Sequence, residues 1–331
     1  MINTLIISGS IAGLIILIIL MKLLKMTVGK KKAAKELSSI SVKKLSPMGA
    51  VNSLSVMPLV DFYADDPSLK TEAGVSYLIK AGDTTILMDT GLNRKKEHPS
   101  PLLHNMKALN ISPDDIDMIF ISHPHLDHLG GMAEQKKRQF SISKGPVSLR
   151  SVNVYSPDVV SPSDFNPGPV VEKITNPKVI AEGIASIGII PRSLFFLGYT
   201  REHSLAVNVK GKGIVLIVGC GHQTAERIIE RARQLFDEPI YGIIGGLHFP
   251  VPDGRVMAGP LNIQNMFGND RAPWNPINED ETMHAIQAIR EIKPKLVSLS
   301  AHDSSDWAVE KFKEAFPQQY VDLLVGREIR I

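Results

Sequence analysis

The chain contains a single cysteine, Cys220, in 331 residues. One cysteine excludes an internal disulfide framework and fits a reducing compartment. The sequence also lacks a Gly-x-Ser-x-Gly motif, so the serine nucleophile that this motif marks is not expected. It has no internal repeat at the level of motifs. Stability must therefore come from a packed core, which a hydrophobic content of 44% can build.

Basic residues are concentrated in one short segment. The chain has 37 Lys and Arg against 34 Asp and Glu, but eight of the lysines and only one glutamate lie between Lys22 and Lys44. The remainder of the chain is slightly acidic. We therefore expect no nucleic-acid partner, because such a partner would call for a basic domain.

Charge is absent before Lys22, and the segment from Leu5 to Leu24 is almost wholly apolar. Twenty helical residues rise about 30 Å, the thickness of a bilayer core, so we expect a membrane-spanning helix. A cleaved signal peptide is less favoured because no basic residue precedes the run and no small-residue cleavage site follows it. A buried helix is less favoured because the run has no polar face.

The lysines that follow the apolar run predict the orientation of the chain. By the positive-inside rule they place the rest of the chain in the cytoplasm, as the catalytic part of a single-pass membrane protein. We expect a transmembrane anchor at residues 1–25, a basic linker at 26–50 and one domain at 51–331. The sequence leaves the oligomeric state open.

The rest of the chain alternates strand-like and helix-like runs, which is typical of an α/β domain. Two stretches with many irregular positions, residues 135–200 and 250–277, interrupt the alternation. Residues 135–200 can form a lid or a wall of a site, or a peripheral surface loop. The expected strands are residues 53–59, 74–80, 85–89, 117–121, 204–209, 213–218, 240–244, 296–300 and 320–325. The expected helices are residues 101–109, 224–236, 278–292 and 306–316.

Three histidines and an aspartate lie together after a short apolar run, in His123-Pro124-His125-Leu126-Asp127-His128. Neutral imidazole nitrogens and carboxylate oxygens are ligands for Zn²⁺, Fe²⁺ or Mn²⁺. His123 and His125 are two residues apart, so on an extended segment both point to one side. Asp127 and His128 then turn the corner and can face a second ion. The alternative is a histidine-rich surface loop that binds nothing.

Three further histidines follow apolar strands. They are His222 in Gly219-Cys220-Gly221-His222, His248 in Gly245-Gly246-Leu247-His248, and His302 in Ala301-His302-Asp303. Strand ends at one edge of a sheet are where α/β folds place their sites. One histidine at a strand end is more often structural than a ligand, but three of them after the first motif indicate a metal centre.

The order of these motifs resembles the metallo-β-lactamase fold, whose signature is His-x-His-x-Asp-His followed here by Leu129-Gly130-Gly131. Asp89-Thr90-Gly91 is similar to the strand-end Asp-Thr-Gly of that fold. The Gly-Cys-x-His and Gly-Gly-x-His pairs resemble one branch, the archaeal 7,8-dihydropterin-6-methyl-4-(β-D-ribofuranosyl)aminobenzene 5'-phosphate synthase-like proteins, with many members known only as metal-dependent hydrolases. The resemblance covers roughly residues 50–331. It implies a four-layer αβ/βα sandwich.

The resemblance also implies one or two divalent ions, with zinc expected and iron or manganese as alternatives. The implied ligands are His123, His125 and His222 for the first ion, and Asp127, His128 and His302 for the second. Many relatives have a bridging aspartate where this chain has His248. An imidazole nitrogen cannot bridge two ions as a carboxylate can. His248 is therefore expected either to bind one ion or to donate a proton to the substrate.

We also predict the roles of two residues near the motifs, Asp89 and Cys220. Asp89 is expected to accept the free N–H of a ligating imidazole, although an Asp-Thr-Gly turn with backbone bonds alone is the alternative. Cys220 is not expected to be a ligand, because its neighbour His222 fits that role. Asp127 and His248 are the residues expected to take part in catalysis.

The resemblance implies a hydrolase in which a metal-bound hydroxide attacks a phosphoester or a carboxylic ester or lactone. One alternative is a synthase of the methanopterin pathway that acts on a phosphoribosyl-type substrate. Another is a non-catalytic metal-binding module. The expected partner is a small-molecule substrate. A lipid-like substrate is a further hypothesis, based on the apolar N-terminal run and on Phe267 and Trp274 in the second irregular stretch.

Overall fold

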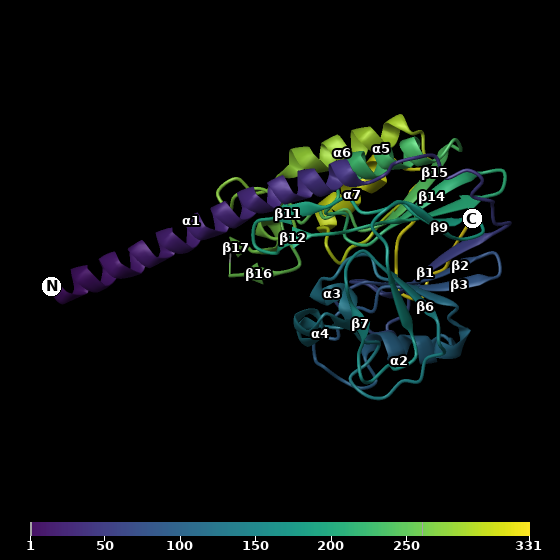
Figure 1. Cartoon of the computed structure of the whole chain (residues 1–331), viewed down its shortest axis with the longest axis horizontal. Helices are drawn as coiled ribbons and strands as arrows, with labels where there is room; N and C mark the ends of the chain where they lie inside the picture. The colour runs from purple at the N-terminus through teal and green to yellow at the C-terminus, as the bar shows by residue number, and fades with distance from the viewer. Residues whose placement is uncertain (1, 260) are drawn as a thin grey trace.

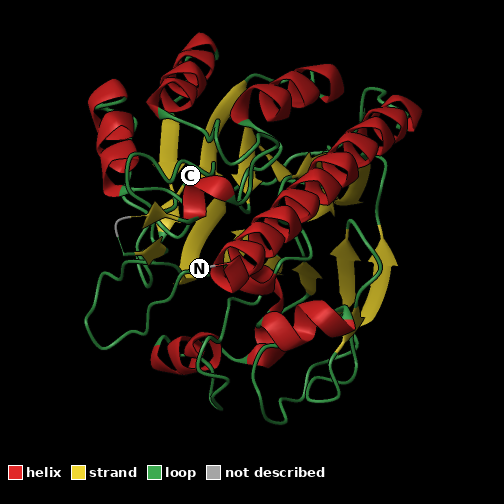
Figure 2. Cartoon of the chain, turned by 90° about the vertical axis from the view of Figure 1, so that its left-hand side faces the viewer, coloured by secondary structure: helices red, strands yellow, loops and turns green. Residues whose placement is uncertain are grey.

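The computed structural model describes residues 2–259 and 261–331, without the side chains of residues 2–12, 15, 258 and 261. Two sheets lie face to face, and helices cover their outer faces (Figure 1; Figure 2). The predicted α/β sandwich is therefore confirmed. Its two sheets place many of the candidate site residues at the ends of their parallel strands.

The first sheet has the order β19-β1-β2-β3-β4-β6-β8. Its strands are β1 (Leu54–Val60), β2 (Ser76–Ala81), β3 (Thr84–Met88), β4 (Met118–Phe120), β6 (Asn153–Ser156), β8 (Val170–Lys173) and β19 (Ile329–Arg330). The ladders β3–β4, β4–β6 and β6–β8 are parallel. Parallel strands end at the same edge, so Asp89 after β3 comes close to Ser122 after β4.

The second sheet has the order β18-β15-β14-β13-β10-β9. Its strands are β9 (Lys178–Ala181), β10 (Ile184–Ser186), β13 (Leu205–Val209), β14 (Gly213–Val218), β15 (Ile240–Gly245) and β18 (Leu296–Leu299). The ladders β14–β15 and β15–β18 are parallel. The segments that carry His222, His248 and His302 therefore leave the sheet at one edge.

Alternation of side chains along the strands produces the four layers. Tyr77 of β2 packs between the sheets with Ile217 of β14. Its neighbour Leu78 points to the outer face, where it joins Met106 of α2 (Pro101–Ala108). Leu216 of β14 points to the other outer face. Each central strand thus has two apolar faces, and neither sheet can stand in water uncovered.

The outer face of the second sheet is covered by α5 (Ala225–Leu235), α6 (Glu279–Glu291) and α7 (Asp306–Ala315). Local sequence sets where these helices begin. Asn278 and Glu281 form a capping box at α6, and Ser305 caps α7 by accepting from the Ala308 amide. The α2 helix begins in the same way, with Ser100 as its cap and Pro101 at its first position.

Shorter elements surround the site. They are α3 (Leu126–Leu129), α4 (Met132–Lys137), the strand pair β5 (Gln139–Phe140) with β7 (Ser161–Pro162), the hairpin β11 (Arg192–Leu194) with β12 (Gly198–Thr200), the pair β16 (Met257–Ala258) with β17 (Leu261–Asn262), and the 3-10 turns η1 (Pro113–Asp115) and η2 (Gln264–Met266). Several of these lie within the two stretches expected to be irregular. Both stretches contribute residues beside the site.

The prediction of a strand over residues 320–325 is wrong. Tyr320 forms an isolated bridge with Val297 at the edge of the second sheet, and Val325 forms another with Ala64 beside the first sheet. The chain crosses here from one sheet to the other, so it cannot pair continuously with either. The last strand is β19, which pairs with β1.

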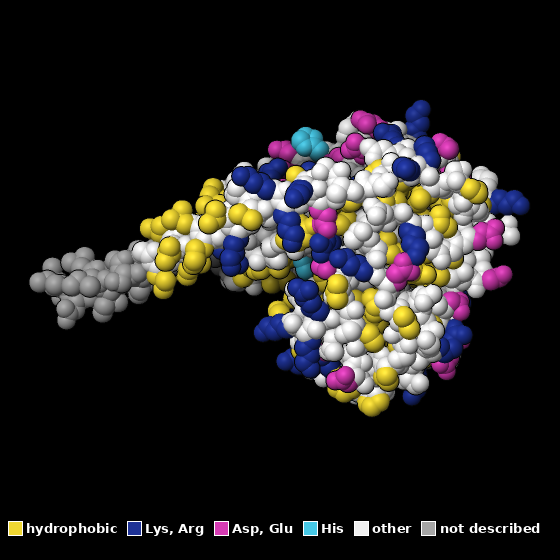
Figure 3. Space-filling model, viewed as in Figure 1, with side chains coloured by type: hydrophobic (Ala, Val, Ile, Leu, Met, Phe, Trp, Pro, Cys, Tyr) yellow, Lys and Arg dark blue, Asp and Glu magenta, His cyan; other side chains and the backbone are white. Residues whose placement is uncertain are grey.

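The N-terminal segment forms one helix, α1 (Ile2–Ser39), which extends away from the sheets toward the N-terminus (Figure 1). It does not end after the apolar run but continues through the lysines. Its C-terminal half packs on β11 and β12: Ala33 is buried, and a side chain at Gly29 would collide with Ser193. Figure 3 shows apolar side chains on the described part of this helix that projects from the body, and Lys and Arg side chains where the helix meets the body.

The prediction of a membrane anchor, and with it of a single-pass membrane protein with a cytoplasmic domain, is corrected by the structure. Among the residues that the structure describes, no helix is long and apolar enough to cross a bilayer. Much of the predicted span, residues 2–12 and 15, lies outside the described side chains. Part of the segment expected to be a linker is the packed end of α1.

Candidate metal centre

Seven side chains converge in two adjacent groups at the strand ends. The first ligand group is His123, His125 and His222, and the second ligand group is Asp127, His128, Cys220 and His302. Within each group the potential ligand atoms all lie within 4.8 Å of one another. The rings of His123 and His128, one from each group, are 4.1 Å apart between centroids. The structure therefore brings together all six residues predicted as metal ligands.

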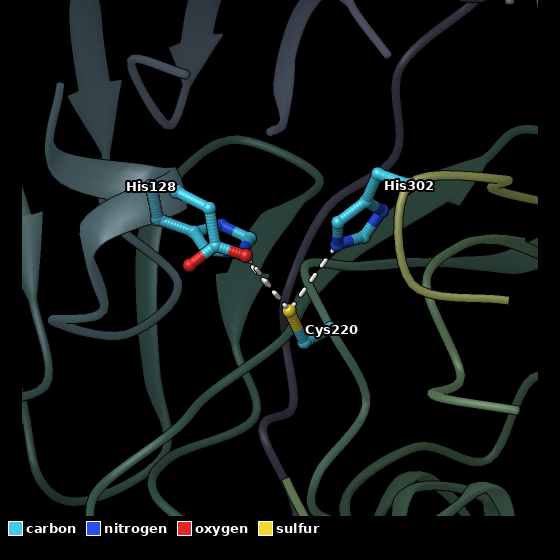
Figure 4. Close-up of side chains that lie close together, drawn as sticks. His128, Cys220 and His302 are labelled. Carbon is cyan, nitrogen blue, oxygen red and sulfur yellow. Dashed lines mark hydrogen bonds and ion pairs between the residues drawn. The ribbon is translucent and has the colours of Figure 1, made fainter. Parts of the chain in front are cut away.

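Cys220 lies in the middle of the second group. Its sulfur is 3.0 Å from His128 Nε2, 3.2 Å from His302 Nε2 and 3.9 Å from Asp127 Oδ2 (Figure 4). From the sequence, Cys220 was not expected to be a ligand, because its neighbour His222 fits that role. The available signal was that the only cysteine of the chain stands two residues before a predicted ligand, in a turn after a buried strand.

Asp89 connects the two groups. It is fully buried, and its Oδ2 atom lies 2.7 Å from His128 Nδ1. Ser122 donates its hydroxyl to the same oxygen at 2.7 Å, and its Oγ lies 3.0 Å from His123 Nδ1. Because a carboxylate only accepts, these contacts place protons on both Nδ1 atoms and turn both Nε2 atoms toward the ligand groups. A side chain at Gly219 would collide with Ser122 and disrupt this contact.

Polar partners also orient the other three imidazoles. His302 Nδ1 lies 2.6 Å from Ser300 Oγ, which in turn donates to Asp61 Oδ2 at 2.5 Å. His222 Nδ1 lies 3.2 Å from Glu202 Oε2. His125 Nε2 lies 3.2 Å from Thr200 Oγ1. Such partners fix the tautomer of a ligating histidine.

Asp61, Ser122, Glu202 and Ser300 were not predicted as site residues. Ser122 directly precedes the first motif, but nothing in the sequence distinguishes Asp61, which is 239 residues away from Ser300. The two meet because β1 and β18 end near each other in different sheets. His203, next to Glu202, is buried against Phe120 with its rings stacked 4.1 Å apart, and so it packs in the core.

A buried nitrogen without a partner shows what the first group is suited to bind. His123 Nε2 is buried and has no hydrogen-bond partner among the described residues. A buried polar atom left unpaired is costly unless an ion or another group satisfies it. Burial, aided by the neighbouring imidazoles, lowers the pKa of His123 well below its usual value. Burial also lowers the pKa of His125 and of His222 to about 3. The donors are therefore neutral and fit a divalent cation.

The electrostatics of the second group differ. Burial raises the pKa of the Cys220 thiol well above its usual range. Burial opposes charge on His128, but Cys220, Asp89 and Asp127 raise its pKa well above the usual value. Burial likewise opposes charge on Asp127, yet His128, His302 and His125 lower its pKa below the usual range. Thiolate, imidazole and carboxylate together form a donor set that suits zinc.

His248 lies beside the first group without joining it. Its ring is 4.8 Å from that of His222, and its Nε2 donates to the Phe267 carbonyl at 3.0 Å. The Nδ1 atom is buried and has no hydrogen-bond partner among the described residues. Burial lowers the pKa of His248 to about 3. At neutral pH the ring therefore offers a lone pair, which does not suit the expected role of proton donor.

Both groups open into one cavity of about 440 Å³. His125, Asp127, Cys220, His222, His248, His302 and Asp303 line its floor. Its walls include Leu197, from the turn between β11 and β12, and Phe267, from the second irregular stretch. The volume falls within the range of small-molecule sites, about 300–1,000 Å³. Trp274, also named in the lipid hypothesis, is 65% exposed and does not line this cavity.

Comparison with known proteins gives one family and a consistent fold. Residues 69–225 match the model of the metallo-beta-lactamase superfamily. The 7,8-dihydropterin-6-methyl-4-(beta-D-ribofuranosyl)-aminobenzene-5'-phosphate synthase of Methanocaldococcus jannaschii is 26% identical over 262 residues, which span 68% of this chain and 87% of that protein.

Two solved structures share the fold. Tm1679, described as a metal-dependent hydrolase of the beta-lactamase superfamily, matches with a TM-score of 0.54 and 20% identity over 84% of this chain and 99% of that one. The metallo-beta-lactamase fold protein YhfI of Bacillus subtilis matches with a TM-score of 0.50 and 14% identity over 85% of this chain and 100% of that one. These similarities concern the fold alone.

Proposed function

Because this chain contains a metallo-beta-lactamase superfamily domain, we propose that it is a metal-dependent hydrolase with two divalent ions, zinc at both positions, acting on a phosphoester or a carboxylic ester or lactone. The observation that carries the proposal is the pair of adjacent ligand groups at the floor of a cavity. Asp127 belongs to one of these groups and faces the cavity, as a residue that acts at the reacting centre must.

Each ligand group would hold one of the two ions. The first group would hold one ion through three neutral imidazoles, and the second would hold the other through Asp127, His128, His302 and Cys220. Ions bound there would supply Lewis-acid polarisation of the scissile bond and acidify a water molecule. Asp89, Asp61 and Glu202 keep the imidazole lone pairs directed inward.

His248 completes the site from the side of the cavity. Its Nδ1 lone pair is directed by the hydrogen bond from Nε2 to Phe267 and by the bond from its own amide to Asp303 at 3.0 Å. The unpartnered Nδ1 atom can accept a hydrogen bond from a water molecule or from a substrate hydroxyl in the cavity. We therefore propose that His248 orients the attacking water or the substrate through Nδ1, rather than acting as a proton donor or as a fourth ligand of the first group.

A second candidate is synthase chemistry on a phosphoribosyl-type substrate. It is supported by the similarity to the archaeal synthase, which spans 87% of that protein. The two candidates differ in product: hydrolysis adds water across one bond, whereas a synthase joins two substrates. Incubation with a phosphoribosyl donor and an aminobenzoate, followed by mass spectrometry of the product, distinguishes them.

The experiment that tests the hydrolase is metal analysis of the full chain together with turnover. We expect near two zinc ions per chain, hydrolysis of bis(p-nitrophenyl) phosphate or p-nitrophenyl butyrate, loss of turnover with a chelator and recovery with zinc. Two ions without turnover would indicate a non-catalytic metal-binding module. Near zero ions after reloading with zinc, manganese and iron would refute the proposal.

A further inference from the structure

The cavity above the ligand groups is apolar along its walls and basic at one side. Leu92, Met132, Leu197, Val256 and Phe267 line the walls. Phe267 is held in place by a stacked contact with Phe196, whose ring centroid lies 4.9 Å away. These side chains offer a surface for an aromatic or alkyl group of a ligand, which is the usual composition of a small-molecule site.

Three cations, Arg94, Lys96 and Lys144, line the same cavity. Lys144 is neutralised by an ion pair with the buried Glu134. Arg94 and Lys96 form no ion pair among the described residues, and Glu97, the acidic neighbour of Lys96, pairs with Lys70 at 3.1 Å. Two positive charges at the cavity are therefore available to a ligand.

The loop that carries these two cations is fixed in shape. Glu72 accepts from the amides of Leu92 at 2.8 Å and Asn93 at 2.9 Å. The Asn93 side chain accepts from the Glu97 amide and donates to its carbonyl, both at 3.0 Å. Lys96 has a φ of +56°, a conformation that a non-glycine residue keeps only where its surroundings impose it. The backbone of the loop is therefore ordered before a ligand arrives, while the side chains of Arg94 and Lys96 are exposed.

The acidic residues around the cavity do not cancel this charge. Asp127 belongs to the second ligand group, and Glu134 is already paired with Lys144. Asp303 lies on the floor, where it accepts from the His248 amide and from Ser304 Oγ, each at 3.0 Å. Among the described residues that line the cavity, none offers an unpaired carboxylate on the basic side; Glu72, which accepts from the amides of this loop, is not part of the lining.

We infer that this cavity takes an amphipathic anion, with its phosphate or carboxylate at Arg94 and Lys96 and its apolar portion against Leu197 and Phe267. This inference rests on the proposed function only in one respect: it takes the bound anion to be the substrate of the same site. It narrows the substrate from any ester to a negatively charged one with an aromatic or alkyl part. Uncharged esters of equal size bind the same wall without the contribution of the two cations.

The test uses two fluorescent probes that differ by one charged group. The anion 8-anilinonaphthalene-1-sulfonate and the neutral N-phenyl-1-naphthylamine share their aromatic part. Each is titrated into the full, zinc-loaded chain. We expect the double variant Arg94→Gln/Lys96→Gln to bind the anion about tenfold more weakly at its cavity site and to bind the neutral probe as the unchanged protein does. Salt should weaken binding of the anion alone, because ions screen exposed charges.

Lys95→Gln provides the matched control, because Lys95 is an exposed cation of the same loop that does not line the cavity. It should bind both probes normally. The variant Phe267→Ala should weaken both. Equal loss of anion binding in Lys95→Gln and in the double variant, or no loss in the double variant, would overturn the inference.

The source of the anion is separated by competition. Phenylphosphonate and phenylacetate, which have no ester bond to hydrolyse, each displace the sulfonate probe to an extent that reports a phosphate-like or a carboxylate ligand. Because these titrations need no turnover, the inference can fail while the hydrolase stands. Conversely, the hydrolase can fail while the cavity still binds an anion. The zinc content of the double variant, expected to be unchanged, shows that the ligand groups are intact.

Discussion

The two ligand groups lie side by side but differ in chemistry. The first consists of three imidazoles whose pKa values burial lowers, so its donors carry no proton that a metal must displace. The second contains a thiol and an imidazole whose pKa values are raised, so protons must leave before a cation enters. Adjacent sites in one cavity are therefore expected to differ in pH dependence and in metal preference.

The largest effect on metal content and activity is expected when one ligand is removed from either group. His125→Ala removes a donor of the first group, and His302→Ala removes a donor of the second. We expect each variant to bind about one ion fewer per chain and to have a kcat/KM lower by more than about 100-fold. This loss exceeds the loss of about 10–100-fold that is usual when a residue that contacts a ligand is removed. Plasma mass spectrometry and steady-state kinetics measure both.

His284→Ala, which removes an exposed histidine of α6, is the control for this pair. It should keep two ions. If His125→Ala and His302→Ala each lose both ions, the two groups bind as one unit and the comparison between them breaks down.

The carboxylates behind the imidazoles give a smaller and more selective effect. Asp89 contacts His128 directly and His123 through Ser122, so it serves both groups. Asp61 reaches only His302, through Ser300. Asp89→Asn should therefore lower the affinity for both ions by about 10–100-fold, and Asp61→Asn should lower the affinity for the second ion alone. Competition with a chromophoric chelator measures the two affinities.

Equal effects of the two substitutions on both ions would show that these carboxylates act through general stability rather than through particular histidines. Thermal unfolding of the metal-free variants is the accompanying control. The contact of Asp89 could be predicted from the sequence, whereas the contact of Asp61 could not.

The histidines and Asp127 could be predicted because chemistry and spacing are local: His123 and His125 alternate on one extended segment. Asp89 was identified as a partner because it follows a strand in an Asp-Thr-Gly turn. The four layers were expected from the resemblance to the metallo-β-lactamase fold, and the two apolar faces of strands such as β14 agree with them. Asp61 could not be found, because its role depends on two strand ends meeting across 239 residues. The role of Cys220 depends on side-chain direction, which spacing does not give.

Cys220 provides a third, smaller test of the difference between the groups. Burial holds its thiol protonated in the metal-free protein, so binding of an ion to the second group must release this proton. The affinity of the second ion should therefore fall as pH falls, while the first ion is retained to lower pH. In Cys220→Ser we expect about one proton fewer to be released when the second ion binds.

Isothermal titration of zinc in two buffers of different ionisation enthalpy counts the released protons. The titration of the first ion serves as the internal control. Equal proton release in the unchanged protein and in Cys220→Ser would mean that the thiol keeps its proton and is not a ligand, which would leave Asp127, His128 and His302 as the second set.

The smallest expected effect on the metal centre comes from a buried histidine outside both groups. His203 donates from Nε2 to the Ile121 carbonyl at 2.9 Å and accepts at Nδ1 from Ser186 Oγ at 2.8 Å. Burial lowers its pKa to about 3. The unfolded chain takes up a proton at this residue below about pH 6.5. Its contribution to stability is therefore fully present above pH 6.5 and is lost as pH falls toward 3.

In His203→Gln the two zinc ions should remain, but the decline in stability between pH 6.5 and pH 5 should be smaller than in the unchanged protein by about 2 kcal/mol. Urea unfolding at the two pH values gives the free energy of unfolding, and the change between the two values is compared rather than either value alone. His284→Gln, at an exposed position, should show the same change as the unchanged protein. The same change in His203→Gln would mean that the acid sensitivity comes from the ligand groups, whose buried imidazoles would then be the main targets of protons in this fold.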